Sequence, residues 1–178
     1  RPSRTLDIAQ RLYLDALISY PRTNSQQIPS EIDIKSILRA LGGQRNYAHI
    51  VSTLLAAGSI TPKQGMKTDP AHPAIHPTGN APTRRLSPQE QNIYDIVVRR
   101  FLASLGEPAL KETVRADLRA EKHILHLRGV TTEEPGWTAI YRPYASSEDR
   151  PMPPVKIGET VLLTSVVADR KLTRPPPH

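Results

Sequence analysis

Five prolines within the 26 residues of "ITPKQGMKTDPAHPAIHPTGNAPTRR", residues 60–85, constrain the fold of this chain more than any other feature. Proline has no backbone N–H, and its ring blocks both the interior of a helix and the centre of a sheet. We therefore predict a long loop here, without a helix. A loop of this length inside a compact domain usually either has a function or is disordered.

The chain before this loop has the spacing of three helices. In the first, Thr5 is a candidate cap, Ile8, Leu12 and Ala16 recur at helical spacing, and Pro21 must end the helix. A second helix is predicted to begin near residue 30 and to stop at the glycine pair 42–43, and a third to run over 47–57 and end at the next glycine.

After the loop, "SPQEQNIYDIVVRRFLASLG" predicts a fourth helix. Ser87 and Glu90 form a capping box, Pro88 occupies the first helical position, and Gly106 stops the helix.

From about residue 109 the pattern is typical of strands. "TVRADLRA" alternates apolar and charged residues, and "HILHLRGV" and "ETVLLTSVVADRKL" are rich in Ile, Val, Leu and Thr. Trp137 is expected to anchor this β region. The prediction is an α+β protein with a mainly helical domain over 1–108 and an incomplete β-rich domain over 109–178.

Charge points to a polyanionic partner. The net charge is +7 with a pI near 9.9, which favours nucleic acid, although a basic protein without such a partner stays an alternative. Only 4% of residues are aromatic, so we expect contacts to run mainly through phosphates. The absence of cysteine excludes disulfides and thiolate metal sites, and no apolar run approaches the ~20 residues that span a bilayer.

The stretch "LISYPRTNSQ" presents a phenol beside a guanidinium. A residue before proline favours extended geometry, in which residues i and i+2 point the same way, so Tyr20 and Arg22 are expected to face one volume. A tyrosine nucleophile, whose pKa is ordinarily about 10, needs nearby positive charge, and arginine can also bind a phosphodiester in a bidentate manner. The alternative is a tyrosine packed at a helix end.

The second candidate cluster is "KTDPAHPAIHPTG", which places Lys67, Asp69, His72, His76 and Thr78 in one stiffened loop. Hydrogen bonds to phosphate, or protonation of a leaving oxygen, suit these side chains better than metal binding, because no third histidine or cysteine lies near. Solvated loop histidines are the alternative. The chain has no G-x-x-x-x-G-K-[ST] loop, no D-x-D-x-E cluster for Mg²⁺ and no G-x-S-x-G elbow.

Together, "LYLDALISYPRTNSQQIP" and "TDPAHPAIHPTG" resemble the catalytic-tyrosine domain of type IA DNA topoisomerases, with the archaeal form most similar. The resemblance continues through "IYDIVVRRFLASL" to "LTRPPP", in the family's order. It implies a winged-helix or catabolite-activator-like fold for the helical domain and part of the β-rich gate domain after it. His76 departs from the arginine that is usual in bacterial members.

The resemblance implies that Tyr20 attacks single-stranded DNA and forms a 5′-phosphotyrosine, that Arg22 stabilises the phosphate in the transition state, and that His72 contacts the scissile phosphate. The DNA-binding residues it implies are Lys67, His76, Thr78, Thr23 and Ser25. The Mg²⁺-binding acidic domain and a further DNA-binding domain of the family are missing. We therefore expect an excised piece of a cytoplasmic, nucleoid-associated enzyme, inactive alone and with no metal site of its own.

Three other interpretations remain. A non-catalytic winged-helix DNA-binding module would explain the charge and the helices but not the two clusters. A tyrosine recombinase or type IB enzyme places its tyrosine after the arginines, whereas Tyr20 comes first here. Within the type IA family, the piece could also come from a reverse gyrase.

Overall fold

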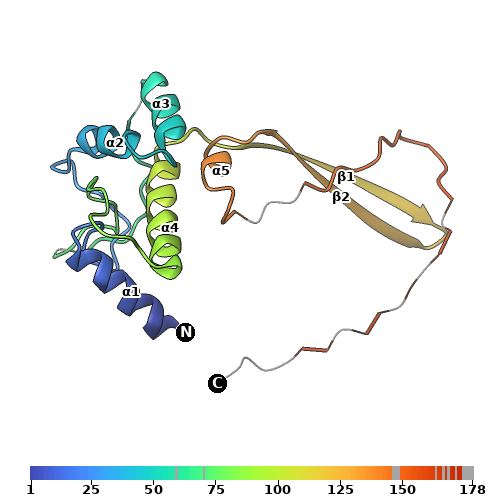
Figure 1. The fold of residues 1–178 in the computed structure, drawn as a ribbon. Helices are drawn as coiled ribbons and strands as arrows, with labels where there is room; N and C mark the ends of the chain where they lie inside the picture. The colour runs from blue at the N-terminus through green and yellow to red at the C-terminus, as the bar shows by residue number, and fades with distance from the viewer. Residues whose placement is uncertain are drawn as a thin grey trace.

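The computed structural model describes residues 1–58, 60–69, 71–145 and 149–162, and positions 164, 165, 167, 169, 170, 172 and 173. Its described part has five helices and one two-stranded antiparallel sheet, a mixed α+β arrangement (Figure 1). The elements are α1 (Pro2–Leu14), α2 (Ile34–Gly42), α3 (Ala48–Ala56), α4 (Pro88–Ser104), β1 (Leu110–Ala120), β2 (His123–Glu134) and α5 (Trp137–Ile140).

The helices form one body around α4. Helix α4 packs against α1 and α5, and α2 packs against α3. Apolar side chains of α1 to α4 and of the segment after α1 share a single core, whose fully buried members include Leu12, Leu38 and Leu102. Prolines keep the loop after α3 free of helix over its described residues, as predicted.

Helix α1 differs from its prediction at both ends. It begins at Pro2, not at a Thr5 cap, because proline is well tolerated in the first turn. It ends at Leu14, well before Pro21, because Ala16 adopts a left-handed conformation with φ of 56°. The N–H of Leu17 donates to the carbonyl of Leu12 (2.9 Å) and the N–H of Ala16 to that of Tyr13 (2.8 Å), which is a Schellman motif.

Local capping signals fix the other helix ends. Helix α2 begins at Ile34, later than predicted, because Asp33 is its N-cap and accepts from the Ser36 N–H (3.0 Å). Helix α4 has the predicted capping box of Ser87 and Glu90, with proline at the start. Gly58, with φ of 77°, follows α3 as predicted.

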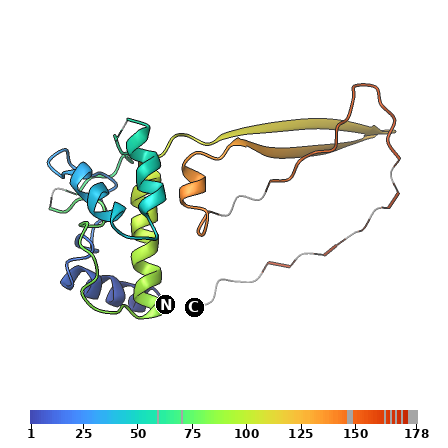
Figure 2. The same cartoon turned by 45° about the horizontal axis from the view of Figure 1, so that its top comes forward.

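Figures 1 and 2 show β1 and β2 as a long hairpin that projects from one side of the helical body. Its register pairs Val114 with Gly129, Ala116 with Leu127 and Leu118 with Leu125, so the predicted alternation is correct. The apolar face is nevertheless solvent-exposed in this chain: the exposed fractions of Val114 and Leu125 are both 41%.

The strand predicted at 159–172 is wrong for the described residues of that segment, which carry neither helix nor strand. A strand needs a neighbour to satisfy its backbone N–H and C=O groups. In the described part of the chain, the ladder consists of β1 and β2 alone. Strand-like composition is therefore not enough to form a strand in this segment when no neighbouring strand is present among the described residues.

One carboxylate attaches the base of the hairpin to the helical body. Asp95 of α4 accepts hydrogen bonds from the hydroxyls of Tyr47 (3.0 Å) and Tyr144 (2.7 Å), and pairs with Arg99 (2.9 Å). Arg99 also donates to the Ile140 carbonyl (3.1 Å). Partial burial and the hydrogen bond to Asp95 raise the pKa of Tyr144 to about 12. The backbone N–H of Trp137 donates to the Glu107 carbonyl before β1 (2.8 Å), and its ring contacts that of Tyr141. Its role as an anchor of the β region stays a prediction.

A second ion pair closes the body where α1 meets α4. Arg84 binds both Asp15, just after α1, and Glu90 in the first turn of α4. The hydrogen bond from Arg84, followed by those from Ser87, lowers the pKa of the Glu90 carboxyl to about 2. Sequence analysis did not identify this link, since Asp15 lies far from Arg84 and Glu90 along the chain.

Candidate functional site, a tyrosine in contact with a histidine

The two clusters predicted from the sequence pair with each other. Ile18 and Pro77 form an antiparallel bridge. Beside it, the N–H of Ser19 donates to the His76 carbonyl (2.9 Å), and the N–H of Thr78 donates to the Leu17 carbonyl (3.1 Å). The Ser19 hydroxyl also accepts from the His76 N–H (3.0 Å). This pairing brings the chain after α1 against the proline-rich loop.

Further backbone bonds continue the pairing along both segments. The N–H of Gln26 donates to the Lys67 carbonyl (2.8 Å), and the N–H of Ala74 donates to the Gln27 carbonyl (2.8 Å). Gly65 lies close against Gln26, and its N–H donates to the Gln26 carbonyl (3.1 Å). The described residues of the loop are thus ordered by the tyrosine segment, without helix or regular sheet.

The Tyr20 ring lies between two other rings. Its centroid is 4.6 Å from that of His72, with the planes tilted by 47°. On another side Tyr13 makes an edge contact at 5.3 Å, with the planes at 72°. Tyr20 and His72 are both half-buried, so each keeps a solvent-accessible edge. Two of the predicted catalytic residues are therefore in contact.

Tyr13 is a site residue that sequence analysis missed. It lies near the end of α1 and was expected to be a core or boundary residue, yet its side chain is 39% exposed and packs on Tyr20. The signal for it was weak, because a tyrosine at helical spacing is ordinarily part of a core. Only the reversal of the chain after α1 shows that the two rings meet.

Asp69 fixes the backbone that carries His72. One of its carboxylate oxygens accepts from the N–H groups of Ala71 (2.9 Å) and His72 (3.3 Å). Both bonds lower the pKa of Asp69, and the bond from Ala71 has the larger effect. From the other side the Thr23 hydroxyl donates to the His72 carbonyl (3.3 Å). The histidine is thus held by both segments.

Arg22 and Lys67 are the predicted cationic residues on the two paired segments. Both are exposed, and within the described part of the chain neither side chain makes a hydrogen bond or ion pair. Among the described residues, no hydrogen bond or cation–π contact joins the Arg22 side chain to Tyr20 or His72. Both charged groups are therefore available to an anion that reaches the tyrosine.

The remaining predicted DNA-binding residues hold the site together. The Thr23 hydroxyl accepts from the Ser25 N–H (2.9 Å), and the Ser25 hydroxyl accepts from the Gln27 N–H (3.1 Å). The Thr78 hydroxyl donates to the Ala16 carbonyl (2.6 Å).

His76 lies inside the body, with an exposed fraction of 8%. Its Nδ1 is 2.8 Å from the Ala74 carbonyl oxygen. Because a carbonyl only accepts, Nδ1 carries the hydrogen and donates it.

Metal binding does not fit the described residues. In the part of the chain that the structure describes, no group of three or more His, Asp or Glu side chains is placed to hold a metal ion. No helix of these described residues has both the length and the apolar character needed to cross a bilayer.

Comparison with known proteins gives one consistent family. A family model described as DNA topoisomerase matches residues 1–178. DNA topoisomerase 1 of Pyrococcus horikoshii is 41% identical over 98% of this chain and 26% of its own length. DNA topoisomerase 1 of Aeropyrum pernix is 40% identical over 93% of this chain and 25% of its own length.

A eukaryotic relative is also similar: DNA topoisomerase 3 of Schizosaccharomyces pombe is 30% identical over 82% of this chain and 23% of its own length. The chain thus spans about a quarter of the length of the curated relatives it matches. With the family model covering every residue and the paired tyrosine and histidine segments in place, this chain belongs to the type IA DNA topoisomerases.

Proposed function

We propose that this chain carries the tyrosine nucleophile of an isomerase that cuts and rejoins one DNA strand. The observation that carries the proposal is the contact between Tyr20 and His72, at 4.6 Å between ring centroids, made by two segments far apart in the sequence. Both rings retain an accessible edge, and two exposed cations, Arg22 and Lys67, lie on the same two segments and make no side-chain ion pair with the described residues.

In the proposed cleavage, the Tyr20 oxygen bonds to a backbone phosphorus while the bond from phosphorus to the 3′-oxygen breaks. The phenol loses its proton and the 3′-oxygen gains one, which leaves a 5′-phosphotyrosine and a free 3′-hydroxyl. Because the phosphodiester energy is kept in the new ester, the reverse attack by the 3′-hydroxyl reseals the strand. Passage of another strand in between would change DNA topology.

The side chains around Tyr20 divide between contact and support. Arg22 would bind the non-bridging oxygens on which charge develops, and His72 would contact the scissile phosphate. Lys67 would bind a neighbouring phosphate. We place Thr23, Ser25, Thr78 and His76 along the DNA path, where their internal hydrogen bonds would orient the contacting groups.

Type IA enzymes use Mg²⁺, and we propose that the ion is held outside this chain, by the rest of a longer, intracellular, nucleoid-associated protein. The chain alone would then bind single-stranded DNA without cutting it. A winged-helix-like helical domain over 1–108 and a gate-domain portion over 109–178 remain our proposal for its organisation.

The test uses a longer protein that contains this chain and the acidic domain. It is incubated with Mg²⁺ and single-stranded DNA labelled near either end in turn, then denatured. We expect label on the protein only from the piece joined through its 5′-phosphate, and Tyr20→Phe should abolish it. Tyr13→Phe is the matched control, since it removes a hydroxyl from the neighbouring ring, and it should keep the adduct.

An adduct that survives Tyr20→Phe, or none with the unaltered protein, would contradict the proposal. In that case Tyr20 is structural, and the chain is better explained as a non-catalytic DNA-binding module.

A further inference from the structure

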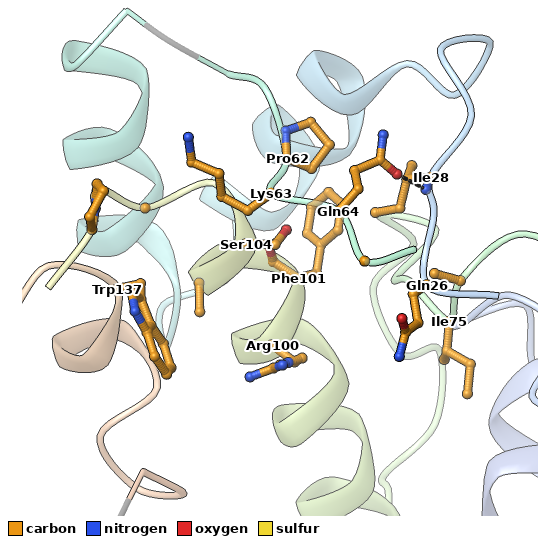
Figure 3. Close-up of a pocket in the computed structure, with 15 residues that line it drawn as sticks. Gln26, Ile28, Pro62, Lys63, Gln64, Ile75, Arg100, Phe101, Ser104 and Trp137 are labelled. Atoms are coloured by element: carbon orange, nitrogen blue, oxygen red, sulfur yellow. Dashed lines mark hydrogen bonds between the residues drawn. The ribbon is translucent and has the colours of Figure 1, made fainter. Parts of the chain in front are cut away.

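A pocket of about 580 Å³ lies on the outer side of the C-terminal half of α4. Figure 3 shows Trp137 on one side of it and Gln26 and Ile75 on the opposite side, with Phe101 and Ser104 of α4 between them. This volume is within the range of pockets that hold small organic ligands. The function proposed for Tyr20 does not use it.

The charge of the lining favours an anion. Arg100 and Lys63 line the pocket, and no aspartate or glutamate does so among the described residues. Both cations are exposed. The guanidinium of Arg100 lies over the Tyr141 ring, 5.4 Å from its centroid, and no carboxylate among the described residues forms an ion pair with it.

The walls suit a planar ring. Trp137 is half-buried, so part of its indole remains accessible. Opposite it, Gln26 points a side-chain amide toward the pocket (Figure 3), and that amide can donate to a base. A flat apolar surface, an amide and two cations match the parts of a nucleotide: base, base edge and phosphate.

The pocket and the tyrosine site share one stretch of the loop, because Ala74 and Ile75 line the pocket and follow His72 closely in the chain. Ile75 is three residues after His72, and an extended chain covers at most roughly 11 Å over that interval. The Ser19 hydroxyl, next to Tyr20, donates to the carbonyl of Ala74, which also lines the pocket (3.5 Å). One DNA strand can therefore reach both places.

We propose that this pocket binds one nucleotide of single-stranded DNA, on the strand that stays attached to Tyr20 after cleavage. The base lies against Trp137, and the adjoining phosphates are bound by Arg100 and Lys63. The assignment of the strand rests on the function proposed above, whereas nucleotide binding does not. Such a contact would keep the attached end oriented on this domain until resealing.

Trp137 is the single tryptophan of the chain, so its fluorescence reports directly on the pocket. The chain is titrated with a ten-nucleotide single-stranded DNA at low salt, and binding is measured separately from the anisotropy of a dye on the same oligonucleotide. We expect the tryptophan emission to be quenched with the same midpoint as the anisotropy change. The readout is binding by a chain that is not expected to cut DNA, which separates this test from that of the nucleophile.

Charge variants have matched controls elsewhere on the surface. Arg100→Ala should weaken binding about fivefold. It should also reduce the slope of the logarithm of the binding constant against the logarithm of the salt concentration by about 0.7, the value expected for one phosphate contact in single strands. Arg39→Ala, which removes an equivalent exposed arginine from α2, should change neither. Lys63→Ala is compared with Lys35→Ala in the same way. Ser104→Leu fills the pocket without a change of charge and should abolish the quenching.

If the DNA binds, either of two results overturns the proposal. One is saturable binding by anisotropy with unchanged tryptophan emission and an unaltered affinity of Ser104→Leu, because the DNA then binds elsewhere on the chain. The other is equal weakening by Arg100→Ala and Arg39→Ala, because the effect then reflects net charge alone. The absence of any binding at low salt also contradicts it.

Discussion

The replacement Ala16→Gly should stabilise the chain, although glycine usually destabilises. Ala16 occupies the position after the end of α1 where a Schellman motif requires a left-handed conformation, and its φ is 56°. An L-residue pays about 1–2 kcal/mol for this conformation, while glycine adopts it freely. The Ala16 carbonyl accepts from Thr78 and Asn80, and these bonds do not need the methyl group.

The net gain follows from two opposing contributions. Against the relieved strain stands the larger freedom of glycine in the unfolded chain, which costs about 0.5–1 kcal/mol. We expect a net gain of about 0.5–1 kcal/mol. With a urea m-value of roughly 2 kcal/mol/M, the unfolding midpoint should rise by about 0.25–0.5 M. Far-UV circular dichroism against urea measures this directly.

Ala40→Gly is the matched control, because Ala40 is an exposed residue inside α2. There glycine should lower the free energy of unfolding by about 1 kcal/mol. The same substitution should thus change the free energy of unfolding in opposite directions at the two positions, which tests the geometry of the turn at residue 16. If Ala16→Gly lowers the midpoint as Ala40→Gly does, residue 16 is not left-handed in solution and the account of this turn is wrong.

Three further predictions concern the charges and caps. The pKa of Glu90 in the folded chain is about 2. The Glu90 carboxylate therefore contributes fully to stability above about pH 4.5, and this contribution is lost as the pH falls toward 2. Glu90→Gln should remove this part of the acid dependence of the urea midpoint. The pKa of Tyr144 is raised to about 12, so its contribution to stability is present below about pH 10 and is lost as the pH rises toward 12. Tyr144→Phe should therefore weaken the dependence of the urea midpoint on pH on the alkaline side. An unchanged pH dependence in either variant would contradict its assignment. Ser87→Ala should cost about 1 kcal/mol of unfolding free energy, measured by urea denaturation, whereas the exposed control Ser3→Ala should cost almost nothing.

Features decided by neighbouring residues could be predicted from the sequence. The capping box at Ser87 and the proline beside it act within one turn, so the start of α4 was predicted correctly. The prolines of the loop after α3 exclude helix wherever they are placed, and the loop contains none over its described residues. The family could likewise be recognised from two short motifs in a fixed order, and the comparisons confirm it.

Predictions that depended on distant partners failed or could not be made. The segment 159–172 has the composition of a strand, but its described residues find no neighbouring strand to pair with. Helix α1 ends at Leu14 in a Schellman motif at Ala16, whose carbonyl accepts from Thr78 and Asn80, two distant residues that no local pattern indicates.

The sequence by itself thus determined the helix signals, the proline-rich loop, the basic charge and the family. Only the tertiary structure decided that Tyr20 meets His72 and Tyr13, because that contact requires two segments to pair across a long interval of the chain. It likewise decided that His76 is buried and that Arg22 stays unpaired within the described residues. Backbone rules act over a few residues and can be read locally, whereas a site made of side chains depends on where the whole core places them.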